Sequence, residues 1–187
     1  MQLSSRTKFL LLIGLFVLPV AAAYLSYFGW RPAGHTNYGE LITVTPLQHT
    51  VGSTHDGRPF DLKDLQGKWL MVHVGPAACD ADCSQQLYLM RQLRIAQGRE
   101  QSRIERVWVL TDATTVDPKL LGEHAGLHVW RPAAAAFAEQ FPAPRERSAH
   151  IYVIDPLGNL MLRFPEQAEP KGIMKDLKLL LKASQIG

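Results

Sequence analysis

Continuous apolar runs and apolar–polar alternation predict the strands of this chain. Residues 69–74 (WLMVHV) and 103–112 (RIERVWVLTD) are short apolar runs of the buried-strand type. Residues 150–155 (HIYVID) and 159–164 (NLMLRF) flank the turn PLG and predict a β-hairpin. A second, smaller hairpin is expected around the Asp56-Gly57 turn, ending at Phe60.

Apolar residues at helical spacing, together with prolines at expected helix starts, predict four helices between and after these strands. Their markers, in chain order, are Cys83, Leu87, Met90 and Leu93, with Gly98 as a stop; Asp117 and Pro118; Pro132, opening PAAAAFAEQF; and Pro170, followed by Ile173, Met174, Leu177, Leu180 and Leu181. Asp117-Pro118 has the residue types of an N-cap followed by proline at the first helical position.

The order of these elements predicts the fold class. Strands that alternate with helices indicate an α/β fold with a mainly parallel, mixed central sheet flanked by helices. We expect a thioredoxin-like domain over residues 51–187. Residues 31–50 (RPAGHTNYGELITVTPLQHT) have little periodicity and are interpreted as a polar tether.

Residues 9–30 form an apolar segment that is long enough to cross a membrane. The segment FLLLIGLFVLPVAAAYLSYFGW has no charged residue, and about 20 apolar residues span the hydrocarbon core of a bilayer. Arg6 and Lys8 precede the segment, so the positive-inside rule predicts that residues 1–8 are cytoplasmic and that the remaining chain is exported.

The same segment also fits a cleaved signal peptide. Residues 10–20 suit an h-region, and the alanines at 21–23 suit a cleavage site. We favour a retained transmembrane anchor because the apolar run continues past the alanines to Trp30. In a bacterium, this predicts a single-pass inner-membrane protein whose C-terminal domain lies in the periplasm.

Composition argues against nucleic acid as a partner. The 187 residues are 47% hydrophobic and 20% charged, with a formal net charge of +3. The lysines and arginines are scattered along the chain, whereas nucleic-acid binding usually requires a concentrated basic stripe.

Cys79 and Cys83 are the candidate functional residues. They are the chain's two cysteines, and they lie four residues apart where a predicted strand gives way to a predicted helix. Open α/β sheets place their sites at the carboxyl ends of strands, which favours a functional pair. The alternative is that both are small buried apolar residues, and this alternative is stronger for Cys83, which belongs to the apolar stripe of the helix.

The spacing of the two cysteines suits a reducible bond. Residues i and i+4 of a helix have Cβ atoms about 5–6 Å apart, whereas a disulfide needs about 3.5–4.5 Å. A bond therefore requires a loosened first turn. The helix N-terminus makes Cys79 the expected nucleophile, while Asp80 and Asp82 oppose its ionisation. Asp82 with Gln85 also fits a variant capping box.

Two thiolates on one side of a helix start also suit Cu(I), which is a soft ion. A third ligand from His or Met would complete a trigonal copper site. No second pair of cysteines is present to form a structural zinc site.

The segments DGRPFDLKDLQGKWLMVHVGPAACDADC and RSAHIYVIDPLGNL resemble the Sco/SenC family of cytochrome c oxidase assembly proteins. The segments TNYGELI, LYLMRQLRIAQG and RVWVLTD are similar to a proteobacterial set of small, anchored members. The resemblance covers roughly residues 50–185. It implies a membrane-anchored thioredoxin fold, and it implies an oxidase subunit or its copper-site cysteines as the partner.

The chain departs from the family's pattern at the copper ligands. Arg147 stands where the family has its ligating histidine, and His150 lies three residues further on with the opposite strand parity. His150 is therefore a weak candidate third ligand beside Cys79 and Cys83. Ala149 stands near the position where many thioredoxins have a cis-proline. His73, inside the expected strand, is interpreted as structural, or as lining the site.

Three functions remain open at this point. The first is a thiol:disulfide oxidoreductase in which Cys79 attacks a partner disulfide and Cys83 resolves the product. The second is a Cu(I) metallochaperone of the Sco type. The third is a non-catalytic scaffold for oxidase assembly. We rank the oxidoreductase first because the family's ligating histidine is missing.

Overall fold

The chain is divided into two compact units in a computed structural model that describes residues 4–29, 37–184 and 186. The first unit, Met1–Thr36, contains the helix α1 (Ser5–Gly29), and the second, Asn37–Gly187, contains the sheet and the remaining helices. The globular unit therefore begins before residue 51, where the sequence placed its start.

The helix α1 is long and apolar enough to cross a membrane. Its 25 residues exceed the roughly 20 that a bilayer core requires. The helix begins at Ser5, four residues before the predicted segment, while Trp30 lies outside the described residues. An N-terminal apolar helix is thus confirmed, and it is consistent with a single-pass anchor.

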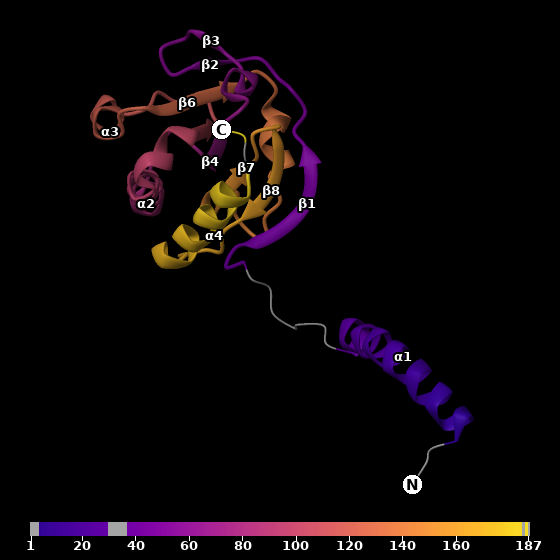
Figure 1. The fold of residues 1–187 in the computed structure, drawn as a ribbon. Coiled ribbons are helices and arrows are strands. Elements are labelled where there is room, and N and C mark those ends of the chain that lie inside the picture. The colour runs from indigo at the N-terminus through magenta and orange to yellow at the C-terminus, as the bar shows by residue number, and fades with distance from the viewer. Residues whose placement is uncertain (1–3, 30–36, 185, 187) are drawn as a thin grey trace. The chain divides into compact units, whose positions relative to one another are not determined.

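Eight strands of the described chain form one mixed sheet in the order β1-β8-β7-β4-β5-β6-β2-β3 (Figure 1). The strands are β1 (Glu40–Pro46), β2 (Gly52–Thr54), β3 (Pro59–Phe60), β4 (Trp69–Gly75), β5 (Ile104–Leu110), β6 (Leu127–Pro132), β7 (Ile151–Ile154) and β8 (Asn159–Arg163). Only β4, β5 and β6 pair in parallel, and the other pairs are antiparallel. The predicted mixed sheet is confirmed, but it is not mainly parallel.

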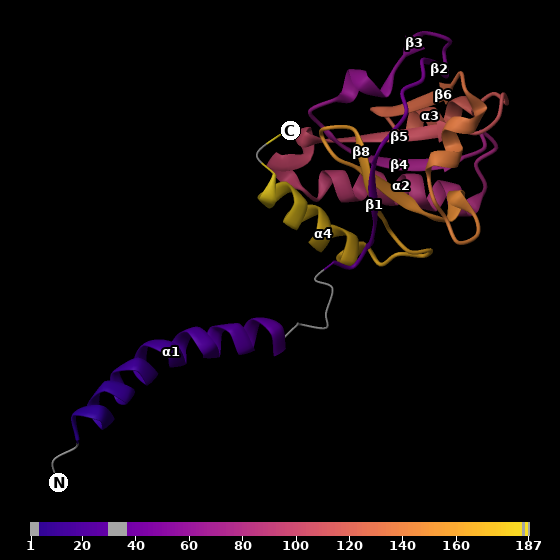
Figure 2. The same cartoon turned by 90° about the vertical axis from the view of Figure 1, so that its right-hand side faces the viewer.

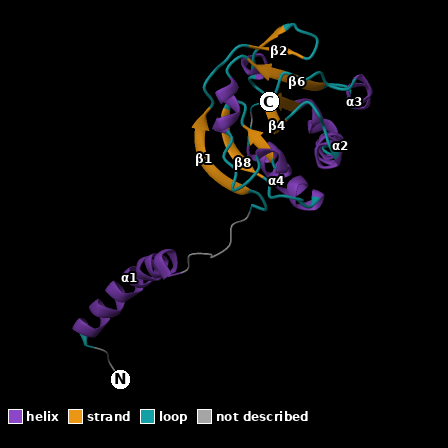
Figure 3. Ribbon diagram, turned by 180° about the vertical axis from the view of Figure 1, so that it is seen from behind, coloured by secondary structure: helices purple, strands orange, loops and turns teal. Residues whose placement is uncertain are grey.

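Helices cover the sheet, as the pattern predicted. The α-helices are α2 (Ala81–Ile95), α3 (Pro118–Glu123) and α4 (Pro170–Ala183), and the 3-10 helices are η1 (Leu62–Leu65), η2 (Gly98–Arg103), η3 (Ala135–Gln140) and η4 (Arg147–Ala149). The helices α2 and α4 pack in one core and lie on the same side of the sheet (Figures 2 and 3).

Alternation along β4 divides the core into two layers. Trp69 and Met71 face the layer that contains the apolar stripes of α2 and α4. Leu70 and Val72 face the opposite layer, which contains Trp130, Phe141 and Tyr152. All seven residues of β4 are buried, as expected for a central strand covered on both faces. Cys79 and Cys83 thus follow a strand that is buried along its whole length.

The sequence pattern did not predict two of the strands, β1 and β6. The predicted tether, 31–50, is wrong for Glu40–Pro46, which form β1 and pair with β8 (Figure 1). Six of the seven residues of β1 are exposed, so this edge strand leaves no apolar alternation to detect. The strand β6 ends at Pro132, where the sequence placed a helix start, and the 3-10 helix η3 begins only at Ala135.

The two hairpin turns and the helix cap at Asp117 are confirmed. The strands β2 and β3 form the small hairpin, and Gly57 at its turn has a φ of 80°, a conformation that glycine adopts without strain. The strands β7 and β8 form the second hairpin. The side chain of Asp117 accepts a hydrogen bond from the Lys119 N–H and so caps α3.

Candidate redox site at the carboxyl end of β4

Cys79 and Cys83 are joined by a disulfide in the connection between β4 and α2. Their Cα atoms lie 5.2 Å apart, within the range that disulfides require. Cys79 precedes the helix and is half-buried, whereas Cys83 lies in the first turn and is 6% exposed. Because Cys79 has no helical backbone, the four-residue spacing can close without distorting α2.

The helix start is capped by Asp80, which lies between the two cysteines. Its Oδ1 accepts a hydrogen bond from the Cys83 N–H at 2.9 Å. The predicted capping box of Asp82 with Gln85 is therefore wrong, because Asp82 already lies inside the first helical turn. The cap fixes Cys83 at the end of α2 where the helix dipole favours a thiolate.

The loop before Cys79 is fastened to the neighbouring strand. The Ala77 N–H donates to Asp112 Oδ1 at 3.0 Å, and Asp112 follows the end of β5. This hydrogen bond holds the pKa of Asp112 below its usual value. On the other side, Cys79 Sγ lies 3.7 Å from Ser84 Oγ, within hydrogen-bonding distance for sulfur. The half-buried sulfur is thus held in a defined position.

A buried histidine and a glutamine connect β4, α2 and η4 beside the disulfide. His73 is fully buried, and its Nδ1 lies 3.1 Å from Gln86 Oε1. Gln86 Nε2 donates to the Ser148 carbonyl at 2.7 Å, so its Oε1 faces His73 and accepts the Nδ1 proton. Burial lowers the pKa of His73 to about 4, which keeps the imidazole neutral at pH 7. Its Nε2 is buried without a described partner.

His150 does not join the cysteines. Its Nδ1 lies 2.8 Å from the Phe164 carbonyl oxygen, and its ring packs beside Tyr152. Tyr152 belongs to the core layer opposite that of Cys83. The described residues contain no group of three or more His, Cys, Asp or Glu side chains placed to hold a metal ion. In this arrangement His150 thus contacts the Phe164 carbonyl and Tyr152 rather than the two cysteines.

The η4 segment next to His150 also departs from a copper site. Arg147 donates from Nε to the Phe141 carbonyl at 3.0 Å, so its guanidinium is occupied in holding a loop. Ala149 lines a groove of about 240 Å³ between η4, β7 and α2. The other residues lining this groove are all uncharged: Gln85, Gln86, Leu89, Ile151, Pro165, Gln167, Ala168 and Pro170.

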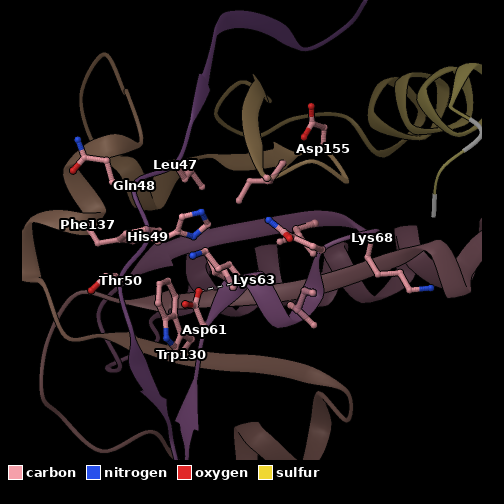
Figure 4. A pocket seen from close by; sticks show the side chains of 16 residues that line it. Leu47, Gln48, His49, Thr50, Asp61, Lys63, Lys68, Trp130, Phe137 and Asp155 are labelled. Atoms are coloured by element: carbon pink, nitrogen blue, oxygen red, sulfur yellow. Dashed lines mark hydrogen bonds between the residues drawn. The ribbon is translucent and has the colours of Figure 1, made fainter.

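A second pocket lies away from the cysteines (Figure 4). Its apolar part includes Leu70, Trp130 and Phe137, from the core layer opposite Cys83. Lys63 and His49 stand at its polar side (Figure 4). It contains none of the residues of the redox site, and it contains no thiol.

Sequence reasoning found the cysteines but missed Gln86 and Asp112. Asp112 could have been found, because it is a carboxylate directly after a predicted strand, at the edge where the cysteines were expected. Gln86 gave no such signal, since its two partners lie 13 and 62 residues away in the chain.

Comparison with known proteins supports the fold. The family described as transmembrane-like, thioredoxin-like, C-terminal domain matches residues 69–184. No curated protein sequence matches the chain. Three similar solved structures are yeast Sco1 with copper bound, the apo Sco1 protein of Thermus thermophilus, and BsSco, a Sco-family cytochrome c oxidase assembly protein in which a disulfide switch was identified.

These three structures are related to the chain in fold at low sequence identity. Yeast Sco1 has 14% identity and a TM-score of 0.62, covering 81% of this chain and 96% of its own. The Thermus thermophilus protein has 20% identity and a TM-score of 0.60, covering 79% and 99%. BsSco has 12% identity and a TM-score of 0.58, covering 80% and 100%.

Proposed function

The chain belongs to the family of transmembrane-like, thioredoxin-like, C-terminal domains, and from this premise we propose that it is a periplasmic thiol:disulfide oxidoreductase. In this proposal, α1 anchors the protein in the bacterial inner membrane. The exported domain assists assembly of the copper centre of cytochrome c oxidase by keeping the cysteines of that centre reduced.

The observation that carries this proposal is the disulfide between Cys79 and Cys83 at the carboxyl end of β4. The half-buried Cys79 is the sulfur that a partner reaches, and the buried Cys83 is the resolving sulfur. The uncharged groove lined by Gln86 and Ala149 includes residues of α2, the helix that contains Cys83, and in this proposal it receives a partner segment.

The reaction transfers two electrons from this protein to its partner. In the reduced protein, the Cys79 thiolate attacks one sulfur of a partner disulfide, and the other partner sulfur leaves as a thiolate. The Cys83 thiolate then attacks Cys79 in the mixed disulfide and releases the second partner thiolate. The products are a reduced partner and the Cys79–Cys83 disulfide, which a separate dithiol reductant must open again.

A second candidate function is Cu(I) delivery to the oxidase. Yeast Sco1 contains copper and shares the fold. Once reduced, Cys79 and Cys83 can supply two soft thiolate ligands, which suit Cu(I). The position of His150 disfavours the third ligand that would complete the site.

An anaerobic experiment separates these functions. The reduced full-length protein in detergent is titrated with Cu(I) and, separately, mixed with the oxidised copper-binding domain of the oxidase. The oxidoreductase proposal expects partner thiols to appear in step with loss of the protein's own thiols, and weak Cu(I) binding. Tight one-to-one Cu(I) binding that Cys79→Ser and Cys83→Ser each abolish, without thiol exchange, would favour the chaperone.

The remaining alternative is a scaffold whose cysteines have no role. This alternative predicts that replacing both cysteines by serine leaves oxidase assembly in cells unchanged. Loss of oxidase activity in the double variant, at unchanged protein level in the membrane, would eliminate the scaffold.

A further inference from the structure

Four lysines of α4 lie on one side of the helix. Lys171, Lys175, Lys178 and Lys182, here called the α4 lysine face, are spaced by four, three and four residues, which places them on one helical stripe. All four are exposed, and none forms an ion pair with a described residue. The opposite stripe, which contains Ile173, Leu177 and Leu181, is buried in the core.

The only acidic residue of α4 does not neutralise this face. Asp176 is buried, 3% exposed, and points to the start of the globular unit. Its carboxylate accepts the Tyr38 N–H at 3.1 Å and the Gly39 N–H at 2.7 Å. Asp176 therefore fastens the incoming chain to the inner side of α4 and leaves the lysines uncompensated.

The side chain of Tyr38 adds further contacts between the entering chain and α4. Its hydroxyl oxygen accepts the Glu169 N–H at 2.8 Å, and its ring leaves no room for a Cβ at Gly172. The chain thus enters the globular unit against the first two turns of α4 (Figure 2). Tyr38 and Gly39 thus join the entering chain to α4 by hydrogen bonds at Asp176 and at Glu169, the residue that precedes the helix.

Little chain separates this entry point from the end of the membrane helix. Seven residues, 30–36, connect Gly29 of α1 to Asn37, and a fully extended chain of this length spans about 25 Å. An anchored α1 therefore keeps α4 within reach of the bilayer surface. Anionic headgroups attract lysines that lie within a Debye length of the surface, about 8 Å at physiological ionic strength.

We propose that the α4 lysine face binds anionic lipid headgroups of the membrane in which α1 is anchored. The proposal rests on the anchor of the proposed function and not on its cysteine chemistry. Met174 and Leu179, which flank the lysines, offer apolar contacts to the interface. Binding by this helix orients the domain relative to the bilayer.

Lysine acylation of the full-length protein in lipid nanodiscs tests this proposal. Discs of phosphatidylcholine alone are compared with discs that also contain phosphatidylglycerol, at low and high salt. We expect acylation of the α4 lysine face to be roughly fivefold slower in the anionic discs at low salt, with the difference lost at high salt. Lys63 and Lys119, exposed on other elements, should react equally in both discs.

A matched pair of variants controls for net charge. The double variant Lys175→Gln with Lys178→Gln should abolish most of the protection of Lys171 and Lys182. The double variant Lys63→Gln with Lys119→Gln removes the same charge elsewhere and should leave that protection intact.

Equal acylation in neutral and anionic discs would overturn the proposal, as would protection that requires an added acidic protein. If the chain does not remain in washed discs, the anchor fails and this proposal fails with it. If the chain stays in the discs and still exchanges thiols, but its α4 lysines are not protected, the lipid-binding proposal is wrong and the proposed function is unaffected.

Discussion

The two ends of β4 carry different kinds of site. The carboxyl end leads into the disulfide, beside which His73, Gln86 and Asp112 form specific hydrogen bonds. The amino end, near Leu70, borders an apolar pocket with Lys63 at its polar side (Figure 4). Of these two ends, the first contains the thiols, which can exchange electrons and bind a soft metal ion. The two ends therefore differ in side-chain chemistry, and it is the thiols, not the presence of a pocket, that make the carboxyl end the candidate redox site.

Replacing the cysteines at the carboxyl end of β4 should have the largest effect, which is on thiol exchange. Cys79→Ser should abolish thiol exchange with a partner disulfide. Cys83→Ser should stop the reaction at a mixed disulfide, because the resolving thiol is missing. The accumulation of that adduct is measured by mass spectrometry under non-reducing conditions.

The control for the cysteine variants lies at the other end of β4. Lys63→Gln changes the pocket without altering any group beside the disulfide, so its exchange rate should equal that of the unmodified protein. A mixed disulfide formed equally by Cys79→Ser and Cys83→Ser would contradict the assigned roles.

Gln86→Leu should produce the next largest effect, on stability. It leaves the His73 Nδ1–H and the Ser148 carbonyl without their observed partner. Unpaired buried polar groups cost about 1–3 kcal/mol each, and Ser148 can recover part of this from water, so we expect a loss of about 2–3 kcal/mol. Urea unfolding measures it. Gln85→Leu, on the exposed side of the same turn, should change stability by no more than about 0.5 kcal/mol.

The pH dependence of stability should reveal the buried His73. Burial lowers its pKa in the folded protein to about 4, below the ordinary value of 6.5. Between these values the unfolded state binds the proton and the native state does not, so stability decreases as the pH falls. The expected loss from pH 7 to pH 5 is about 2 kcal/mol.

Two variants assign this loss to His73. Urea unfolding at pH 7 and pH 5 measures the loss of stability. His73→Phe should abolish the part of this loss that His73 causes, whereas His55→Gln, which replaces an exposed histidine, should retain it. An unchanged slope in His73→Phe would show that other groups cause the pH dependence.

The smallest predicted effect is the difference in stability between variants of two neighbouring carboxylates, Asp80 and Asp82. Asp80→Ala removes the cap of α2 and should cost about 1 kcal/mol. Asp82→Ala, inside the first turn, should cost only a few tenths of a kcal/mol because it removes only a charge near the helix dipole. Thermal unfolding of the oxidised variants measures both, and the reverse order would restore the capping box expected from the sequence.

The sequence predicted the elements that are buried and regular. The strand β4 and the stripe of Cys83, Leu87, Met90 and Leu93 were visible because burial imposes an apolar pattern. The edge strand β1 was missed because most of its side chains are exposed. The strand β6 was missed because His128 and Arg131 interrupt its apolar pattern and because it ends in Pro132, which was interpreted as a helix start.

The site was predictable only in part for a similar reason. Cys79 and Cys83 lie together in the sequence, and their residue type signals their chemistry. Gln86 and Asp112 act through hydrogen bonds to segments 62 and 35 residues away, and such pairings are set by the tertiary fold. The strand parity of His150 indicated its direction, but its contact with the Phe164 carbonyl required the structure.

A redox titration of the folded protein with alkylation of its thiols tests the central claim most directly. The full-length protein is equilibrated with dithiol/disulfide buffers of increasing reducing strength and then treated with an alkylating reagent, while circular dichroism follows the fold. We predict that Cys79 and Cys83 become labelled together in one two-electron step while the domain stays folded. Labelling of both cysteines without any reductant, or labelling that begins only when the domain unfolds, would contradict a disulfide that opens and closes in the native protein.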